Sequence, residues 1–272
     1  MTAATTTGGF VAPATNRAHA ISDAITIAWR NVINMRRNPQ LLVFATVQPV
    51  IFVLIFRYVF GGAILVPPGY GSYVNYLMPG IFVQTVVFGS MQTGVGLADD
   101  LQKGLVDRFR SLPMARSAVL VGRTLADLLR NVFVVILMAV VGYLVGWRPQ
   151  TNALEITAGL ALVVAFSYSL SWIFAIVGMS ARDSETAQAI SFPIIAPLVF
   201  LSSAFVPTST IHPSWLGTFA EHQPVSVVVD AVRSLLSGVG DPLPKCVGAI
   251  VWLAVIIALC APLAVARYRR AV

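Results

Sequence analysis

The segment 98–116 carries the densest group of charged side chains in the sequence, and it lies between two long apolar stretches. On a helix from about Ala98 to Ser111, Leu101, Leu105 and Phe109 would share one stripe, and the charges would take the other. Acids and bases mixed in this way suit ion pairs and hydrogen bonds with a partner surface. We therefore expect a short amphipathic docking helix that ends before Pro113. Its charged residues are Asp99, Asp100, Lys103, Asp107, Arg108 and Arg110, with Arg116 following.

The alternative for this segment is a solvated loop whose arginines only fix the topology of a membrane protein. Topology depends on Lys and Arg, whereas Asp99, Asp100 and Asp107 add nothing to that signal. The mixture of signs therefore favours a docking surface.

Residues that could carry catalysis or bind a metal are not grouped in the sequence. His19, His212 and His222 lie in separate connections, and neither an H-E-x-x-H motif nor a Cys/His cluster is present. No serine lies in a G-x-S-x-G context, and no G-x-x-x-x-G-K-[ST] phosphate loop occurs. We expect no catalytic site, no metal site and no cofactor bound by this chain.

The composition is that of a membrane protein. The chain is 57% hydrophobic and 11% charged, with a mean hydropathy of +0.81, against about 45–50% apolar and about 25% charged residues in soluble domains. Six apolar stretches can each cross a hydrocarbon core of about 30 Å as a helix. The predicted fold is therefore all-α, with six transmembrane helices. These stretches lie near Leu41 to Phe60, Tyr76 to Leu97, Ala118 to Val145, Leu154 to Met179, Ala187 to Phe205 and Cys246 to Ala266.

The basic residues predict the orientation of these spans. They gather before the first span, between the second and third, between the fourth and fifth, and after the sixth. By the positive-inside rule, both termini are expected to be cytoplasmic. The formal charge of +7 lies in short clusters beside apolar segments rather than along one polar surface, so no nucleic-acid partner is expected.

The two remaining segments are predicted from their composition and periodicity. Residues 1–17 are expected to be a disordered tail, and residues 18–272 the membrane domain. From about Ala18 to Arg37, apolar residues recur every three to four positions, which predicts an amphipathic helix in the membrane interface. A helix in the groove of a soluble partner is the alternative. The long connection Val206 to Lys245 contains an amphipathic stretch and predicts short helices at the outer membrane face.

Three charged side chains lie close together near the cytoplasmic half of the third predicted span. Asp127 follows Arg123 by four residues and precedes Arg130 by three, so the three can pair on one helix face. The alternative is a functional intramembrane acid.

Three glutamines also fall within predicted spans, and they are candidates for a substrate path or a subunit interface. Hydrogen bonding to neighbouring helices is the alternative role for such side chains. These residues are Gln48, Gln84 and Gln92.

The segment between the second and third spans resembles the core of the ABC-2 type permease family, in its daunorubicin-resistance-type branch. The match covers nearly the whole chain. The residues that carry it are Met78-Pro79-Gly80, Asp99-Asp100, Lys103-Gly104, Asp107 to Pro113 and, before the last span, His222-Gln223-Pro224-Val225.

The resemblance implies the permease subunit of an ABC exporter in a bacterial cytoplasmic membrane. A coupling helix of about Asp99 to Arg110 would contact a separate ATPase, which binds the ATP and Mg. Two ATPase copies and a second permease, identical or different, would complete the complex. The expected substrates are hydrophobic or amphiphilic compounds, either drugs or lipids. The implied coupling residues are Asp99, Asp100, Lys103, Gly104, Asp107, Arg108, Phe109 and Arg110.

Three other functions are weighed against this one. A sister branch exports polysaccharides or other envelope polymers, which predicts an aromatic-lined channel. A proton-coupled secondary transporter needs an acid near mid-membrane, and Asp127 is the nearest. A membrane-embedded transferase needs acids or histidines that converge at one membrane face, and the sequence groups none.

Overall fold

The structure, a computed structural model, describes residues 33, 39–59, 61, 66–104, 116–205 and 207–271. This part of the chain is helical and contains no strand, which confirms the predicted all-α class. A helix occupies each of the apolar stretches of the sequence. These helices are α2 (Pro39–Tyr58), α3 (Tyr73–Gln102), α5 (Arg116–Val145), α6 (Ala153–Ser180), α7 (Ser184–Phe200) and α10 (Pro242–Ala271).

Four helices in the described residues are long and apolar enough to cross a membrane: α3, α6, and the segments Leu120–Val145 of α5 and Pro242–Tyr268 of α10. The protein is therefore a multi-pass membrane protein. Helix α7 has 17 residues, and Thr46–Tyr58 of α2 is a shorter apolar segment. Helix α7 is therefore shorter than the roughly 20 residues that a straight span needs, whereas α2 as a whole has 20 residues; six crossings remain a prediction.

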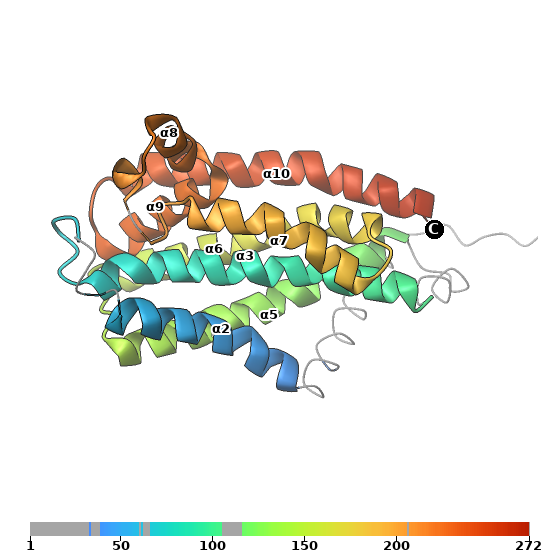
Figure 1. The fold of residues 1–272 in the computed structure, drawn as a ribbon, viewed down its shortest axis with the longest axis horizontal. Helices are drawn as coiled ribbons and strands as arrows, with labels where there is room; N and C mark the ends of the chain where they lie inside the picture. The colour runs from blue at the N-terminus through green and yellow to red at the C-terminus, as the bar shows by residue number, and fades with distance from the viewer. Residues whose placement is uncertain are drawn as a thin grey trace, which may run out of the picture.

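The long helices form an elongated bundle with their axes along its length (Figure 1). Helices α3, α6 and α10 finish at one end, where α2, α5 and α7 begin. We call this the Asp99 end, and the opposite end the Arg233 end, after a residue on each.

Helix α3 lies inside the bundle because its neighbours approach it very closely. It packs against α2, α5, α6 and α7, and every residue from Tyr73 to Val87 is buried. At the crossing with α6, a Cβ on Gly178 would overlap the backbone of Gly94, and a Cβ on Gly94 would lie 2.5 Å from the Phe174 carbonyl oxygen. The two glycines thus allow backbone contact between α3 and α6.

The chain between α7 and α10 forms a 3-10 turn (Thr208–Thr210) and two short helices, α8 (Ser214–His222) and α9 (Pro224–Ser237), at the Arg233 end. Gln223 joins them to α7: its Nε2 donates to the carbonyl oxygens of Leu198 at 2.6 Å and Leu201 at 3.0 Å. These carbonyls belong to the last turn of α7, which has no further turn to pair with. Pro224 begins α9, where its missing N–H costs nothing.

Two predicted segments lie outside the described residues. The tail 1–17 is one. The other is the amphipathic helix at 18–37, of which only Ile33 is described, as helical and exposed.

Candidate functional site

The first half of the predicted docking segment lies at the Asp99 end and differs from the expected single helix. Helix α3 continues to Gln102, so Asp99 and Asp100 form its last turn. The chain then turns at Lys103 and Gly104, and the φ of Gly104 is +63°. A left-handed residue ends a helix, so the prediction of one helix from about Ala98 to Ser111 is wrong at this point. The other predicted coupling residues lie outside the described part: Asp107, Arg108, Phe109 and Arg110.

The charged side chains of this turn divide between solvent and the bundle. Lys103 Nζ lies 2.7 Å from Asp99 Oδ2, and the Lys103 side chain is 63% exposed. The hydrogen bond from Lys103 to Asp99 raises the pKa of Lys103, but an exposed pair of this kind adds little stability. Asp100 instead pairs with Arg123 of α5. The turn therefore presents one ion pair to solvent and anchors the other between helices.

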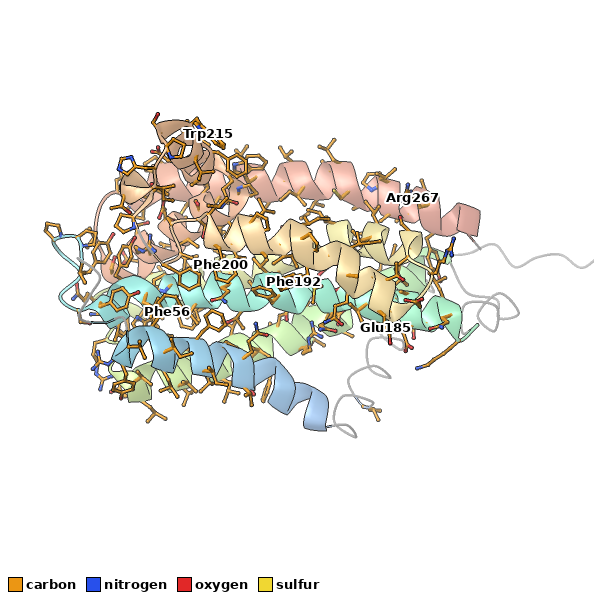
Figure 2. The ribbon with its side chains drawn as sticks, in the orientation of Figure 1. Phe56, Glu185, Phe192, Phe200, Trp215 and Arg267 are labelled. Carbon is orange, nitrogen blue, oxygen red and sulfur yellow. The ribbon has the colours of Figure 1, made fainter. Side chains whose placement is uncertain are left out.

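Three further helices, α6, α7 and α10, also have one end at the Asp99 end. Arg267 of α10 donates from Nη1 to Ser180 Oγ at 2.6 Å, at the end of α6. Tyr268 is buried in a cluster with Leu97 and Trp172. Figure 2 shows Arg267 and Glu185 at this end of the bundle. The end of α3 is thus packed against the ends of α6 and α10.

The charged residues of α5 pair as their spacing predicts, and the structure adds contacts to α3. Arg123 Nε lies 3.9 Å from Asp127 Oδ2, and Arg130 Nη1 lies 3.8 Å from Asp127 Oδ1. Mutual pairing is therefore confirmed. Sequence reasoning missed the pair that Arg123 forms with Asp100, and the hydrogen bond that Arg130 donates to the Gly89 carbonyl of α3. Both depend on how α3 and α5 pack, which spacing along one helix cannot reveal.

The structure does not bring the three candidate glutamines into one site. Gln84 is 3% exposed, and its Oε1 has no hydrogen-bond partner among the described residues. Gln48 on α2 and Gln92 on α3 are exposed. Gln84 is therefore a core residue of α3, whereas Gln48 and Gln92 are available to a partner or substrate.

A group of phenylalanines on α2, α3, α7 and the turn that follows α7 was not predicted. Phe56 stacks on Phe205 with centroids 4.6 Å apart, and Phe205 lies 6.0 Å from Phe200. Phe88 and Phe192 are 6.4 Å apart, and Phe192 and Phe200 are about half exposed. Figure 2 shows Phe56, Phe192 and Phe200 on the side of the bundle that carries α2 and α7. Stacked rings offer flat apolar faces to aromatic or acyl groups.

Arg233, in the long connection before the last apolar stretch, is buried, with 4% of its surface exposed. Its guanidinium donates to Asp230 Oδ1 at 2.7 Å, the Ser203 carbonyl at 2.6 Å and the Tyr76 carbonyl at 3.2 Å. It also lies 4.0 Å from the centroid of the Tyr76 ring. In the sequence, only the spacing to Asp230, three residues earlier on the same helix, could have predicted an ion pair with Arg233. We call Arg233 with Asp230, Tyr76 and Ser203 the Arg233 anchor.

No group of three or more His, Cys, Asp or Glu side chains within the described ranges could hold a metal ion.

The sequence matches the ABC-2 type transporter family over residues 23–237, which include the docking segment and the Gln223 joint. It is 35% identical over 222 residues to the daunorubicin resistance ABC transporter permease protein DrrB1 of Streptomyces coeruleorubidus, covering 82% of this chain and 77% of that protein. The chain belongs to the ABC-2 type transporter family. Members of this family are the membrane subunits of ABC transporters, and the ATPase is a separate subunit.

Other relatives of this ABC-2 permease extend beyond one organism. A probable doxorubicin resistance ABC transporter permease of Mycobacterium tuberculosis is 28% identical over 229 residues, covering 84% of this chain and 81% of that protein. A putative transport permease of Pyropia yezoensis is 22% identical over 234 residues, covering 85% and 80%. Membership in the family therefore does not depend on a single match.

Proposed function

We propose that this ABC-2 permease is the membrane subunit of an exporter that moves hydrophobic or amphiphilic compounds, drugs or lipids, out of the cytoplasm or the inner leaflet. In this proposal, six helices cross a bacterial cytoplasmic membrane, with the Asp99 end and both termini on the cytoplasmic side. A second permease and two copies of a separate ATPase complete the complex. ATP and Mg bind to the ATPase.

The observation that carries the proposal is the charged turn at the end of α3. It presents Asp99 and Lys103 to solvent, while Asp100 ties the same turn to α5. A partner that binds to residues 99–110 would therefore act on α3, whose first half is buried in the core of the bundle. ATP binding by that partner would then shift the bundle between two conformations.

The substrate class is supported by the phenylalanines and by the names of the relatives. The faces of Phe192 and Phe200 are exposed beside α2, and Gln48 and Gln92 are exposed on α2 and α3. We propose that aromatic faces and amide groups on this side of the bundle contact an amphiphilic substrate or the second permease. Two relatives named above carry daunorubicin or doxorubicin resistance in their names, which favours a planar amphiphile.

A proton-coupled transporter is a less suitable function because of the contacts of Asp127. Such a transporter needs an acid that can bind and release a proton, but Asp127 has an arginine on each side at 3.8–3.9 Å. Asp127 is thus the ion-pair partner of two arginines on its own helix.

The test is transport in proteoliposomes that contain this permease and the ABC ATPase with which it copurifies. We expect ATP-dependent movement of doxorubicin or of a fluorescent lipid, with no requirement for a proton gradient. The double variant Asp107→Ala, Arg108→Ala should insert normally but lose copurification or ATP-driven transport. The matched control is Gln102→Ala, which changes an exposed uncharged residue beside the same turn.

Three results would overturn parts of the proposal. Transport that follows a proton gradient without the ATPase would support a secondary transporter. Movement of a lipid-linked polysaccharide, but of neither test compound, would support the polymer exporter. If the double variant behaved as the wild type does, residues 99–110 would not be the docking segment.

A further inference from the structure

A row of four charged side chains links the Asp99 end of the bundle to its middle. Asp100 on α3 pairs with Arg123 on α5, and Arg123 also lies 3.9 Å from Asp127. Asp127 lies 3.8 Å from Arg130 in turn. We call Asp100, Arg123, Asp127 and Arg130 the Arg123 ladder. Their formal charges sum to zero.

The far end of the ladder is tied to α3 and α6. Arg130 donates to the Gly89 carbonyl of α3. The next residue, Asn131, donates from Nδ2 to Ser167 Oγ of α6 at 2.6 Å. Ser90 of α3 donates to the Ser167 carbonyl at 3.0 Å. A continuous set of polar contacts therefore runs from the last turn of α3 to the point where α3, α5 and α6 meet.

Two glycines on α3 make room for these side chains. A Cβ on Gly96 would overlap the guanidinium of Arg123, and a Cβ on Gly89 would lie 2.5 Å from Asn131 Oδ1. The two positions are seven residues apart, which is about two helical turns, so they lie on the same face of α3. This face of α3 is therefore shaped to receive the polar side chains of α5.

Helix adhesion alone is a poor account of the ladder. Charged groups inside a membrane bundle are costly, and apolar contacts of the same volume can hold helices at least as well. The contacts of Asp127 are long, and its Oδ2 has no hydrogen-bond partner among the described residues. Arg123, by contrast, has a carboxylate within reach on α3 and another on its own helix.

We propose that Arg123 exchanges between Asp100 and Asp127 as the docking turn moves, and so couples that turn to the middle of the bundle. When the end of α3 moves away from α5, Arg123 can keep a carboxylate partner by turning to Asp127, so that the arginine is not left unpaired, while Asp100 moves away with the turn. The two pairings are the two discrete arrangements that a coupling element needs. This inference rests on the proposed function, in which the ATPase acts on the turn at Asp99.

The experiment measures the amount of substrate moved for each ATP hydrolysed, in proteoliposomes with the copurifying ATPase. Asp127→Asn keeps the shape of the side chain and the Asp100–Arg123 pair, but removes the second position for Arg123. We expect the transport-to-hydrolysis ratio to fall about fivefold or more, the lower range of a typical coupling energy. ATPase copurification should persist, and Asp127→Glu should restore the ratio.

Further variants separate exchange from simple adhesion. Asp100→Asn should lower the ratio as much as Asp127→Asn does, because exchange needs both positions. A purely structural ladder predicts a larger loss for Asp100→Asn, which breaks the closer pair. Gly96→Ala keeps every charge but displaces Arg123, so it should also lower the ratio. The matched controls are Gly248→Ala on α10, where a Cβ meets Val227 at an ordinary 3.4 Å, and Glu155→Gln at the other end of the bundle.

The outcomes distinguish this inference from the proposed function. If the wild-type complex hydrolyses ATP without moving any substrate, the proposed function fails. If the wild type transports with ATP but Asp127→Asn keeps the wild-type ratio, only the exchange at Arg123 is overturned. The exchange at Arg123 is also overturned if both Asp variants fail to fold, while Gly96→Ala folds and keeps the wild-type transport-to-hydrolysis ratio.

Discussion

The Arg233 anchor and the Arg123 ladder place arginines in the same bundle in very different surroundings. Arg233 has a carboxylate at 2.7 Å, two backbone carbonyls and an aromatic ring, so its donors are well satisfied. The two contacts of Asp127 in the ladder are 3.8 and 3.9 Å long, and one of its oxygens lacks a hydrogen bond among the described residues. Dense, short contacts fix one geometry, whereas sparse, long contacts allow more than one. The Arg233 anchor therefore holds one geometry, whereas the Arg123 ladder has the sparse contacts that the proposed exchange at Arg123 requires.

The largest effect on stability is expected at the Arg233 anchor. Arg233→Ala would remove the cation beside Asp230 and the guanidinium donors to the Ser203 and Tyr76 carbonyls. Removal of one partner from a fully buried pair costs about 3–5 kcal/mol, and a smaller cost is expected here because the Asp230 side chain is 35% exposed. Thermal unfolding of the detergent-solubilised protein should show a large fall in melting temperature or a loss of monodisperse protein.

The matched control is Arg148→Ala at the same end. Arg148 also donates to carbonyls, those of Tyr143 and Trp147, but it is exposed. Its substitution should have a much smaller effect. Equal melting temperatures for the Arg233 and Arg148 variants would show that the anchor does not hold the Arg233 end.

The next effect is expected where α6 crosses α3 at Gly94, which lies between Gly89 and Gly96 on α3. A Cβ in Gly178→Ala would meet the backbone of Gly94, so the two helices must separate. Overpacking of this kind costs about 1–3 kcal/mol. Gly96→Ala should cost less because the tip of a long side chain can move aside. If the melting temperature of Gly96→Ala is lower than that of Gly178→Ala, the predicted backbone contact between Gly178 and Gly94 is contradicted.

A smaller effect is expected at the far end of the ladder. Asn131→Ala removes the hydrogen bond to Ser167, and such bonds between membrane helices contribute about 1 kcal/mol. The melting temperature should fall slightly, and ATP-driven transport should fall further than that change explains. Gln102→Ala, at the exposed end of α3, is a control for loss of an amide side chain. If transport and stability fall in proportion, Asn131 serves only to pack α5 on α6.

The smallest effect is expected at Asp183, which caps α7 at the Asp99 end. The backbone N–H of Thr186 donates to its carboxylate and lowers the pKa of Asp183 below its ordinary value of 3.8. Because the pKa is lowered in the folded protein, the cap gives its full stabilisation when the pH is above the ordinary pKa of Asp183. This stabilisation is lost as the pH falls through the lowered pKa. Asp183→Ala should reduce the melting temperature at neutral pH, and the difference from wild type should shrink in acid below pH 3.8.

The control for the cap is Glu185→Ala, an exposed acid in the first turn of the same helix. It should show a weaker dependence on pH. A difference between wild type and Asp183→Ala that stays constant into acid would exclude the capping role.

Sequence reasoning located every long helix because each apolar stretch is continuous and the hydrophobic requirement of a membrane is strong. It also identified the charge pairing along α5, since spacings of three and four residues bring side chains together on any helix. It placed the docking helix less well. The turn at Lys103–Gly104 depends on a positive φ, which the glycine permits but does not require.

The sequence alone determined that this protein is an all-helical membrane protein with a charged segment after its second apolar stretch and no phosphate-loop motif in the given sequence. Those conclusions follow from composition, local periodicity and motifs, which act within short stretches of chain. Only the tertiary structure decided that Arg123 lies between two carboxylates, that Gln84 is internal while Gln48 and Gln92 are exposed, and that Arg233 is buried. Each of these depends on contacts between helices that are distant in sequence, and such contacts are set by how whole helix faces pack.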